Sequence, residues 1–326
     1  MLLRNSWRVP ALLVALAAFG QDKPATPPAT DDSGVVFRTD TRLVVCHTTV
    51  VDKSNHLVTD LPESAFTVSE NGVPQAIKVF RREDVPVSLG LIVDNSGSMR
   101  DKRAKVAAAA LDLVKASNKD DEVFVVNFND DAYLDLPDGK DFTSEIKDME
   151  VALSHIDSRG GTAMRDAIRM SIDHVKQKGR RDKKVLVVVT DGNDNSSVIS
   201  LENLVKASQQ SEVLIYAIGL LSEEEHREAV RAKRALDELA TATGGETFFP
   251  KDLSEVDRYA QDVARDIRSQ YTIEYSPTNA AMDGSYRQIK VAVNAPGHPS
   301  VRTRSGYYAT PDQAPPPPGS NSLKSK

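Results

Sequence analysis

The stretch LGLIVDNSGSMR, residues 89–100, decides the fold of this chain. It begins as a nearly continuous apolar run, which is typical of a strand buried on both faces of a sheet. The run ends abruptly at Asp94, and two hydroxyl side chains follow at alternate positions, Ser96 and Ser98. Ligands of α/β proteins bind beyond the carboxyl ends of parallel strands, so three oxygen-bearing side chains at this point predict a binding site.

The sequence around this stretch alternates between short apolar runs and amphipathic helices. Strands are expected at 85–94, 121–128, 131–136, 183–191, 212–220 and 244–250, and helices at 101–117, 143–156, 162–177, 200–210, 223–243 and 253–270. Strands that alternate with helices predict a mostly parallel sheet with helices on both faces. Right-handed crossovers make this a doubly wound, Rossmann-like α/β domain, which we place at residues 85–269.

Two β-rich segments flank this domain. Residues 35–84 contain many β-branched residues and an Asn71-Gly72 hairpin signal, and residues 270–309 contain three short strands. A small sheet formed by either segment alone would be only marginally stable. We therefore expect the two segments to pair into one β-sandwich, with the α/β domain inserted between them.

The two ends of the chain differ from the rest in composition. Residues 1–20 combine Arg4 and Arg8 with a short apolar run and small final residues, the pattern of a secretory signal peptide. The alternative, an uncleaved membrane anchor, would need a longer apolar run. We expect export to the periplasm, the cell surface or the medium, with no membrane span after cleavage. Residues 21–34 are expected to form a flexible linker, and residues 310–326 a disordered Pro-rich tail.

The overall composition limits the classes of function. The 326 residues suit two domains, and the formal net charge of -6, without a dense stripe of Lys and Arg, argues against a nucleic-acid-binding protein. Cys46 is the only cysteine, so an intrachain disulfide is excluded. Because Cys46 lies in an expected strand, we expect it to be a buried apolar residue.

Two further loops belong to the same edge of the predicted sheet. Thr162 follows two glycines and opens a helix, and Asp191 ends the strand VLVVVTD. The candidate metal ligands are therefore two carboxylates and three hydroxyls, at Asp94, Ser96, Ser98, Thr162 and Asp191. Hard oxygen ligands of this kind suit Mg²⁺, with Mn²⁺ or Ca²⁺ as alternatives. A simpler interpretation is that Ser98 and Thr162 only cap the helices that follow them.

Together these three loops resemble the metal-ion-dependent adhesion site of the von Willebrand factor A domain family. Asp94-Asn-Ser96-Gly-Ser98 is similar to its D-x-S-x-S motif, and the GGT at Thr162 and the TDG at Asp191 match its other two loops in the right order. The resemblance covers residues 85 to about 250, and the flanks are similar to those of a bacterial exported subgroup. It implies Ser96, Ser98 and Thr162 as direct ligands, and Asp94 and Asp191 as ligands directly or through water.

The neighbouring polar residues are expected to have lesser roles. Asp194 and Asn195 should shape the rim of the site. Asp166 should be a surface residue of the first helical turn, with support of the metal ligands as the alternative. The segment from Asp191 has EF-hand-like spacing, but Ser196 stands where that loop needs glycine, so we reject an EF-type site.

The site favours a non-catalytic binding module, in which a divalent cation holds an Asp or Glu carboxylate of a protein partner. Neutral hydroxyl ligands leave the cation able to attract such a group. The alternative is a metal-dependent hydrolase that uses the same site. It would need a base or nucleophile, and the sequence has no Gly-x-Ser-x-Gly elbow and no histidine near the three loops. A nucleotide-dependent, chelatase-like subunit would need a Gly-Lys-Ser/Thr phosphate loop, which the sequence lacks.

Overall fold

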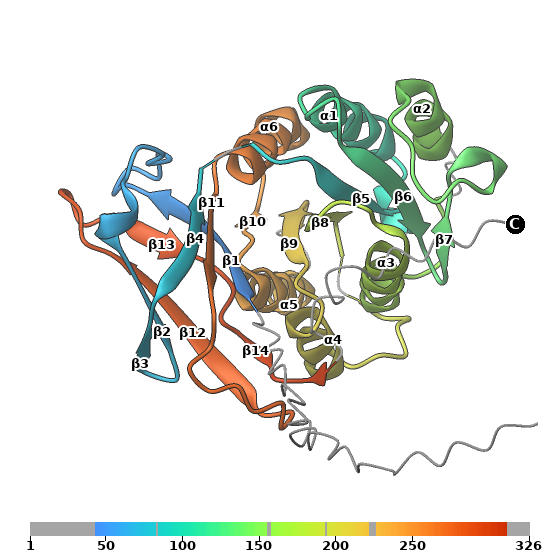
Figure 1. The fold of residues 1–326 in the computed structure, drawn as a ribbon. Helices are drawn as coiled ribbons and strands as arrows, with labels where there is room; N and C mark the ends of the chain where they lie inside the picture. The colour runs from blue at the N-terminus through green and yellow to red at the C-terminus, as the bar shows by residue number, and fades with distance from the viewer. Residues whose placement is uncertain (1–42, 83, 155–157, 193, 222–225, 312–326) are drawn as a thin grey trace, which may run out of the picture. The chain divides into compact units, whose positions relative to one another are not determined.

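The computed structural model describes residues 43–82, 84–154, 158–192, 194–221 and 226–311, and Figure 1 shows its fold. The expected signal peptide at 1–20, the linker at 21–34 and all but the start of the tail at 310–326 lie outside these residues. In the part of the chain that is described, no helix is long and apolar enough to cross a membrane.

A six-stranded sheet forms the centre of the α/β domain. Its order is β10-β9-β8-β5-β6-β7, and every neighbouring pair is parallel except β6 and β7. The strands are β5 (Val87–Asp94), β6 (Glu122–Phe128), β7 (Ala132–Leu134), β8 (Lys183–Thr190), β9 (Leu214–Gly219) and β10 (Thr247–Phe248). All eight residues of β5 are buried, as its apolar sequence predicts for a central strand.

Helices cover both faces of this sheet. They are α1 (Arg103–Lys115), α2 (Ile146–Ser154), α3 (Met164–Lys178), α4 (Leu201–Gln209), α5 (His226–Thr243) and α6 (Val256–Arg268). Helices α1, α2 and α6 lie together on one face, and α3, α4 and α5 lie together on the other (Figure 1). The apolar stripe of α6 is buried, with Val256, Ala260, Val263 and Ile267 facing the core.

Two antiparallel sheets form the second part of the fold, with strand orders β13-β1-β11-β4 and β14-β12-β2-β3. Their strands are β1 (Val44–Val51), β2 (Phe66–Glu70), β3 (Val73–Gln75), β4 (Ile77–Arg81), β11 (Tyr271–Tyr275), β12 (Tyr286–Val293), β13 (Ser300–Arg302) and β14 (Gly306–Tyr308). Both sheets combine strands from the two ends of the described chain, because β1 pairs with β11 and β2 pairs with β12. The predicted fold class, a doubly wound α/β domain flanked by a β-sandwich of N- and C-terminal segments, is confirmed.

The β-sandwich has a hydrophobic core of its own. Cys46 of β1 is fully buried there beside Ile273 of β11, its partner in the strand pair. Burial raises the pKa of the Cys46 thiol to about 12, so the residue is an unreactive apolar side chain, as expected.

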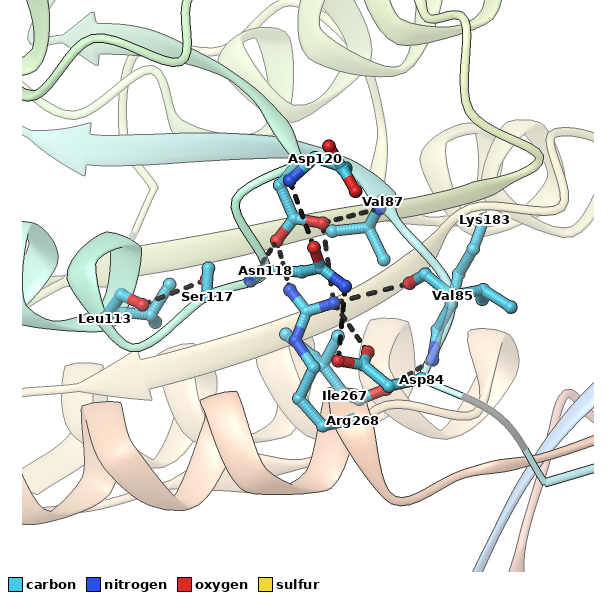
Figure 2. Close-up of polar contacts among 11 residues, drawn as sticks. Asp84, Val85, Val87, Leu113, Ser117, Asn118, Asp120, Lys183, Ile267 and Arg268 are labelled. Carbon is cyan, nitrogen blue, oxygen red and sulfur yellow. Dashed lines mark hydrogen bonds and ion pairs between the residues drawn. The ribbon is translucent and has the colours of Figure 1, made fainter.

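The two connections between the sandwich and the α/β domain are fastened to each other. Arg268, at the end of α6, donates to Asp84 Oδ1 at 2.9 Å and to the Val85 carbonyl at 3.3 Å on the incoming segment (Figure 2). Arg268 also forms an ion pair with Asp121, whose Oδ1 accepts a hydrogen bond from the Val87 amide at 2.8 Å. One guanidinium therefore holds the first strand of the sheet, the segment before it and the last helix at a single point.

Candidate metal centre

The first and third loops of the candidate site lie next to each other because their strands do. Asp94 is the last residue of β5, and Asp191 directly follows β8. These two strands are adjacent and parallel, with Val93 opposite Val189. Ser98 belongs to the short 3₁₀ turn η2 (Gly97–Met99), which leads from β5 towards α1, and Ser96 directly precedes this turn. The carboxyl ends of two central strands thus deliver both carboxylates to one place.

A chain of short oxygen–oxygen contacts links these loops. Ser98 Oγ donates to Asp191 Oδ1 at 2.8 Å, and it lies 3.2 Å from Ser96 Oγ. Neighbouring ligands of an octahedral Mg²⁺ ion, at bond lengths of about 2.1 Å, lie about 3 Å apart. The three side chains therefore fit the edges of one coordination octahedron.

Asp94 lies beneath this group and is inaccessible to solvent. Its Oδ2 accepts a hydrogen bond from Thr190 Oγ1 at 2.6 Å, and its Oδ1 accepts one from the Ser96 amide at 2.8 Å. Burial raises the pKa of Asp94 above its ordinary value, although these hydrogen bonds oppose the shift. A nearby positive charge would stabilise this buried carboxylate, so the environment of Asp94 suits a cation.

Thr162 contributes a hydroxyl from the loop before α3. Its amide donates to Asn195 Oδ1 at 2.8 Å, and its carbonyl accepts from the Asn195 and Ser196 amides. A Cβ placed on Gly192 would lie 3.7 Å from Thr162 Oγ1, so this hydroxyl faces the loop that carries Asp191. The Oγ1 atom makes no hydrogen bond with the described residues, which leaves it available as a ligand.

The interpretation of Ser98 and Thr162 as helix caps is wrong. The cap position of α3 is held by Ala163, and that of α1 by Lys102, and neither helix has a side-chain cap bond. Ser96 precedes the 3₁₀ turn, also without a side-chain cap bond, and Ser98 donates to Asp191 instead.

Lys102 was missed by the sequence reasoning. Its ammonium forms an ion pair with Asp191 Oδ2, and only 1% of the Asp191 side chain is exposed, compared with 27% of Lys102. Both Asp191 oxygens are therefore engaged, Oδ1 by Ser98 and Oδ2 by Lys102. The available signal was the position of Lys102, four residues after Ser98, from which a long side chain reaches back to the edge of the sheet.

A second cation lies behind the site. Arg103 is fully buried, and its Nη2 donates to Asn127 Oδ1 at 3.2 Å and to the Leu153 carbonyl at 3.4 Å. Burial lowers the pKa of Arg103, and attraction to Asp94 and Asp135 opposes this. Because arginine stays protonated in proteins, Asp94 faces a fixed positive charge from the interior.

The rim residues hold the loops in place. Asp194 Oδ2 accepts from the Arg165 amide at 2.6 Å, and Asn195 binds the Thr162 amide, so both shape the rim as expected. Asp166 is more than the surface residue that we expected, because its two oxygens accept from the Val198 and Ile199 amides at 2.8 and 3.0 Å. It fastens the loop after β8 to the first turn of α3.

The two glycines before Thr162 allow a close approach of loops. Gly160 has a left-handed φ of 72°, and a Cβ there would lie 2.0 Å from Asp130 Oδ2. A Cβ on Gly161 would lie 2.3 Å from Ser196 Oγ, and the Gly161 amide donates to Asp130 Oδ1 at 2.7 Å. Larger residues at either position would push Thr162 away from the other loops.

The donor set limits the kind of metal site. Across the described residues, no cluster of three or more His, Cys, Asp or Glu side chains is arranged to hold a metal ion. The candidate centre has only two carboxylates, so hydroxyl oxygens must complete it. Such a set suits a hard cation of the Mg²⁺ type better than a soft one.

Comparisons with known proteins agree with this fold. Mouse integrin alpha-11 is 36% identical over 104 residues, which are 31% of this chain and 8% of that protein. A protein of Borreliella burgdorferi is 24% identical over 183 residues, which are 55% of this chain and 52% of that protein. The chain thus spans about half of one of these curated relatives and a small part of the other.

The solved structure of a von Willebrand factor type A protein from Catenulispora acidiphila aligns with a TM-score of 0.50 at 13% identity, over 83% of this chain and 75% of that one. At this identity the likeness concerns the fold alone. Residues 89–266, more than half of the chain, match the family model of the von Willebrand factor type A domain. The chain therefore belongs to the von Willebrand factor type A domain family.

Proposed function

We propose that this protein is an exported binding module that uses a divalent cation to hold an acidic side chain of a protein partner. Domains of this family are commonly metal-dependent adhesion or protein-binding modules. The observation that carries the proposal is the run of contacts from Ser96 through Ser98 to Asp191 above the buried Asp94.

Each residue would have a defined part in holding the cation. Ser96, Ser98 and Thr162 would be direct ligands, and Asp94 and Asp191 would act directly or through water. Mg²⁺ is the expected ion, with Mn²⁺ or Ca²⁺ as alternatives. When bound, the ion supplies a coordination position that attracts an outside carboxylate, because the hydroxyl ligands do not neutralise its charge.

The remaining residues prepare the site. Asp130 and Asp166 fix the loops that carry Thr162 and the residues after Asp191. Lys102 neutralises Asp191 when no dication is bound, and it must release Oδ2 before that oxygen can bind a metal. The strength of the ion pair between Lys102 and Asp191 therefore opposes metal binding at Asp191 Oδ2.

A metal-dependent hydrolase is the alternative function, and the structure offers less support for it. The polar side-chain contacts of three described histidines lie outside the candidate metal centre: His47 contacts Thr272, His56 contacts Asp52, and His174 contacts the Asp141 carbonyl. A hydrolase would need a base within hydrogen-bond reach of the activated water. The binding module requires no such group.

The test immobilises this protein on a resin and measures which proteins of a bacterial cell-envelope extract the resin retains. We expect a defined set of proteins to be retained in Mg²⁺ and released by chelator. Amidation of the carboxylates of the envelope proteins with carbodiimide and an amine should abolish their retention. Ser98→Ala should retain little, whereas Ser154→Ala, an exposed serine on α2, should behave as the unaltered protein. Retention that survives both chelation and amidation would refute the proposal.

A further inference from the structure

A cleft of about 850 Å³ lies at the amino ends of the parallel strands, the edge of the sheet opposite to the candidate metal centre. One wall carries Lys183, the first residue of β8, and Leu214, the first residue of β9. The other wall is the outer face of the β1–β11 sheet, with His47 and Thr272. A volume of this size is typical of sites for small molecules.

The two faces of β1 differ in chemistry. Val44 and Cys46 point into the core of the sandwich, whereas the alternate residues Val45 and His47 line the cleft. This strand therefore supports a core on one side and a partly polar cavity on the other. The cavity lies where the β-sandwich packs against the α/β domain, and it shares no residue with the candidate metal centre.

The cleft is strongly basic. Among its described lining residues, seven lysines and arginines face three acidic side chains. Two of the cations have acidic partners in the cleft: Arg81 pairs with Glu274, and Arg304 with Glu212. Arg180 pairs with Glu122 at 3.1 Å.

Four cations of the cleft form no ion pair with a described carboxylate. Lys176, Arg181 and Lys184 form no ion pair with the described residues, and Lys184 Nζ donates only to the Arg181 carbonyl at 2.9 Å. The buried ammonium of Lys183 donates to the Ile267 carbonyl, also a neutral group (Figure 2). The charges of Lys176, Arg181 and Lys184 on this wall are thus not paired with a described carboxylate.

Two titratable groups respond to this positive field. Burial holds the pKa of His47 well below its ordinary value, and Lys183, Arg304, Arg81 and Lys184 lower it further. Burial also lowers the pKa of Lys183 to about 7; the charge of Arg268 adds to that shift, and the carboxylates of Asp266, Asp84 and Asp121 oppose it. An anion in the cleft would relieve the repulsion among these groups.

We infer that this cleft binds a small polyanion that carries two or more phosphate or carboxylate groups. Lys176, Arg181 and Lys184 lie along one wall of the cleft, so two of them can contact two anionic groups of one ligand at once. Unpaired guanidinium and ammonium donors bind phosphate and carboxylate oxygens through charge-assisted hydrogen bonds. A nucleic acid is a poorer fit, because the cleft is small and the chain has a net charge of -6.

The test uses the full chain, freed of divalent cations, and two probes, inorganic pyrophosphate and citrate. Metal-free conditions are needed because both probes chelate Mg²⁺. Calorimetric titration at low ionic strength should show saturable binding of at least one probe, weakened by added salt. Binding of pyrophosphate alone would assign the site to phosphates, and binding of citrate alone to carboxylates.

The double variant Lys176→Gln, Arg181→Gln should bind the probe at least about tenfold more weakly. Neither side chain makes a hydrogen bond with the described residues, so the fold should be preserved. The matched control is Lys147→Gln, Lys290→Gln, which removes the same charge from exposed positions outside the cleft. Absence of binding in the unaltered chain, or equal weakening in the control, would each overturn the inference.

Discussion

Replacement of Lys102 by methionine should tighten the binding of Mg²⁺ at the candidate centre. Methionine retains the length and apolar stem of lysine and removes the ammonium that pairs with Asp191 Oδ2. In the unaltered protein this pair must break before Oδ2 can bind a metal, and the ammonium also repels a dication. Both effects disappear in the variant.

The exposure of the two side chains sets the size of the effect. Lys102 is 27% exposed, so solvent screens the pair and the ammonium can swing into water. A partly exposed ion pair contributes about 0.5–1 kcal/mol, which corresponds to a Kd for Mg²⁺ about two- to fivefold lower in the variant. Residual repulsion at low salt would raise the gain to about tenfold, and salt should reduce it.

Calorimetric titration of the full chain with MgCl₂ measures this directly. The control is Lys105→Met, since Lys105 lies on the same helix and pairs with Asp257 of α6, outside the site. Its Kd for Mg²⁺ should stay within about twofold of the unaltered value. An unchanged or weaker affinity in Lys102→Met, or an equal gain in Lys105→Met, would show that the pair does not oppose metal binding.

Three further predictions concern single substitutions. Thr162→Ala should weaken Mg²⁺ binding about tenfold or more while leaving the melting temperature without metal unchanged, because Oγ1 has no hydrogen bond to lose; a lower metal-free melting temperature would contradict this. Gly90→Ala should reduce the free energy of unfolding by about 1–3 kcal/mol in urea titration, because the added Cβ would lie 2.4 Å from Phe124; an unchanged midpoint would contradict the packing. The pKa of Lys183 is lowered to about 7, so the unfolded state binds more protons between pH 7 and about 10, and the unfolding free energy of the unaltered chain relative to Lys183→Met should rise over that range; a flat difference would contradict the shift.

The sequence predicts the α/β domain well because local patterns determine its elements. The apolar run that ends at Asp94 becomes the buried strand β5, and the helix expected at 253–270 appears as α6, Val256–Arg268. The edge strand expected at 131–136 is shorter, since β7 pairs only over Ala132–Leu134 at the margin of the sheet. Burial and periodicity decide central elements, whereas an edge strand depends on a single neighbour.

The contacts that tune the site could not be predicted in the same way. A lysine at the start of a helix normally lies in solvent, and only the fold brings Lys102 to Asp191. Asp166 binds amides that are 32 and 33 residues away. Such non-local contacts have no periodic signal in one sequence.

The most direct test of the central claim is the position of a paramagnetic ion in the folded protein. Substoichiometric Mn²⁺ should broaden the amide resonances of Ser96, Thr162 and Asp191 and of their neighbours, and excess Mg²⁺ should restore them. This result would place one cation among the three loops. Broadening centred elsewhere in the chain, or signals at these loops that Mn²⁺ leaves sharp, would contradict the account.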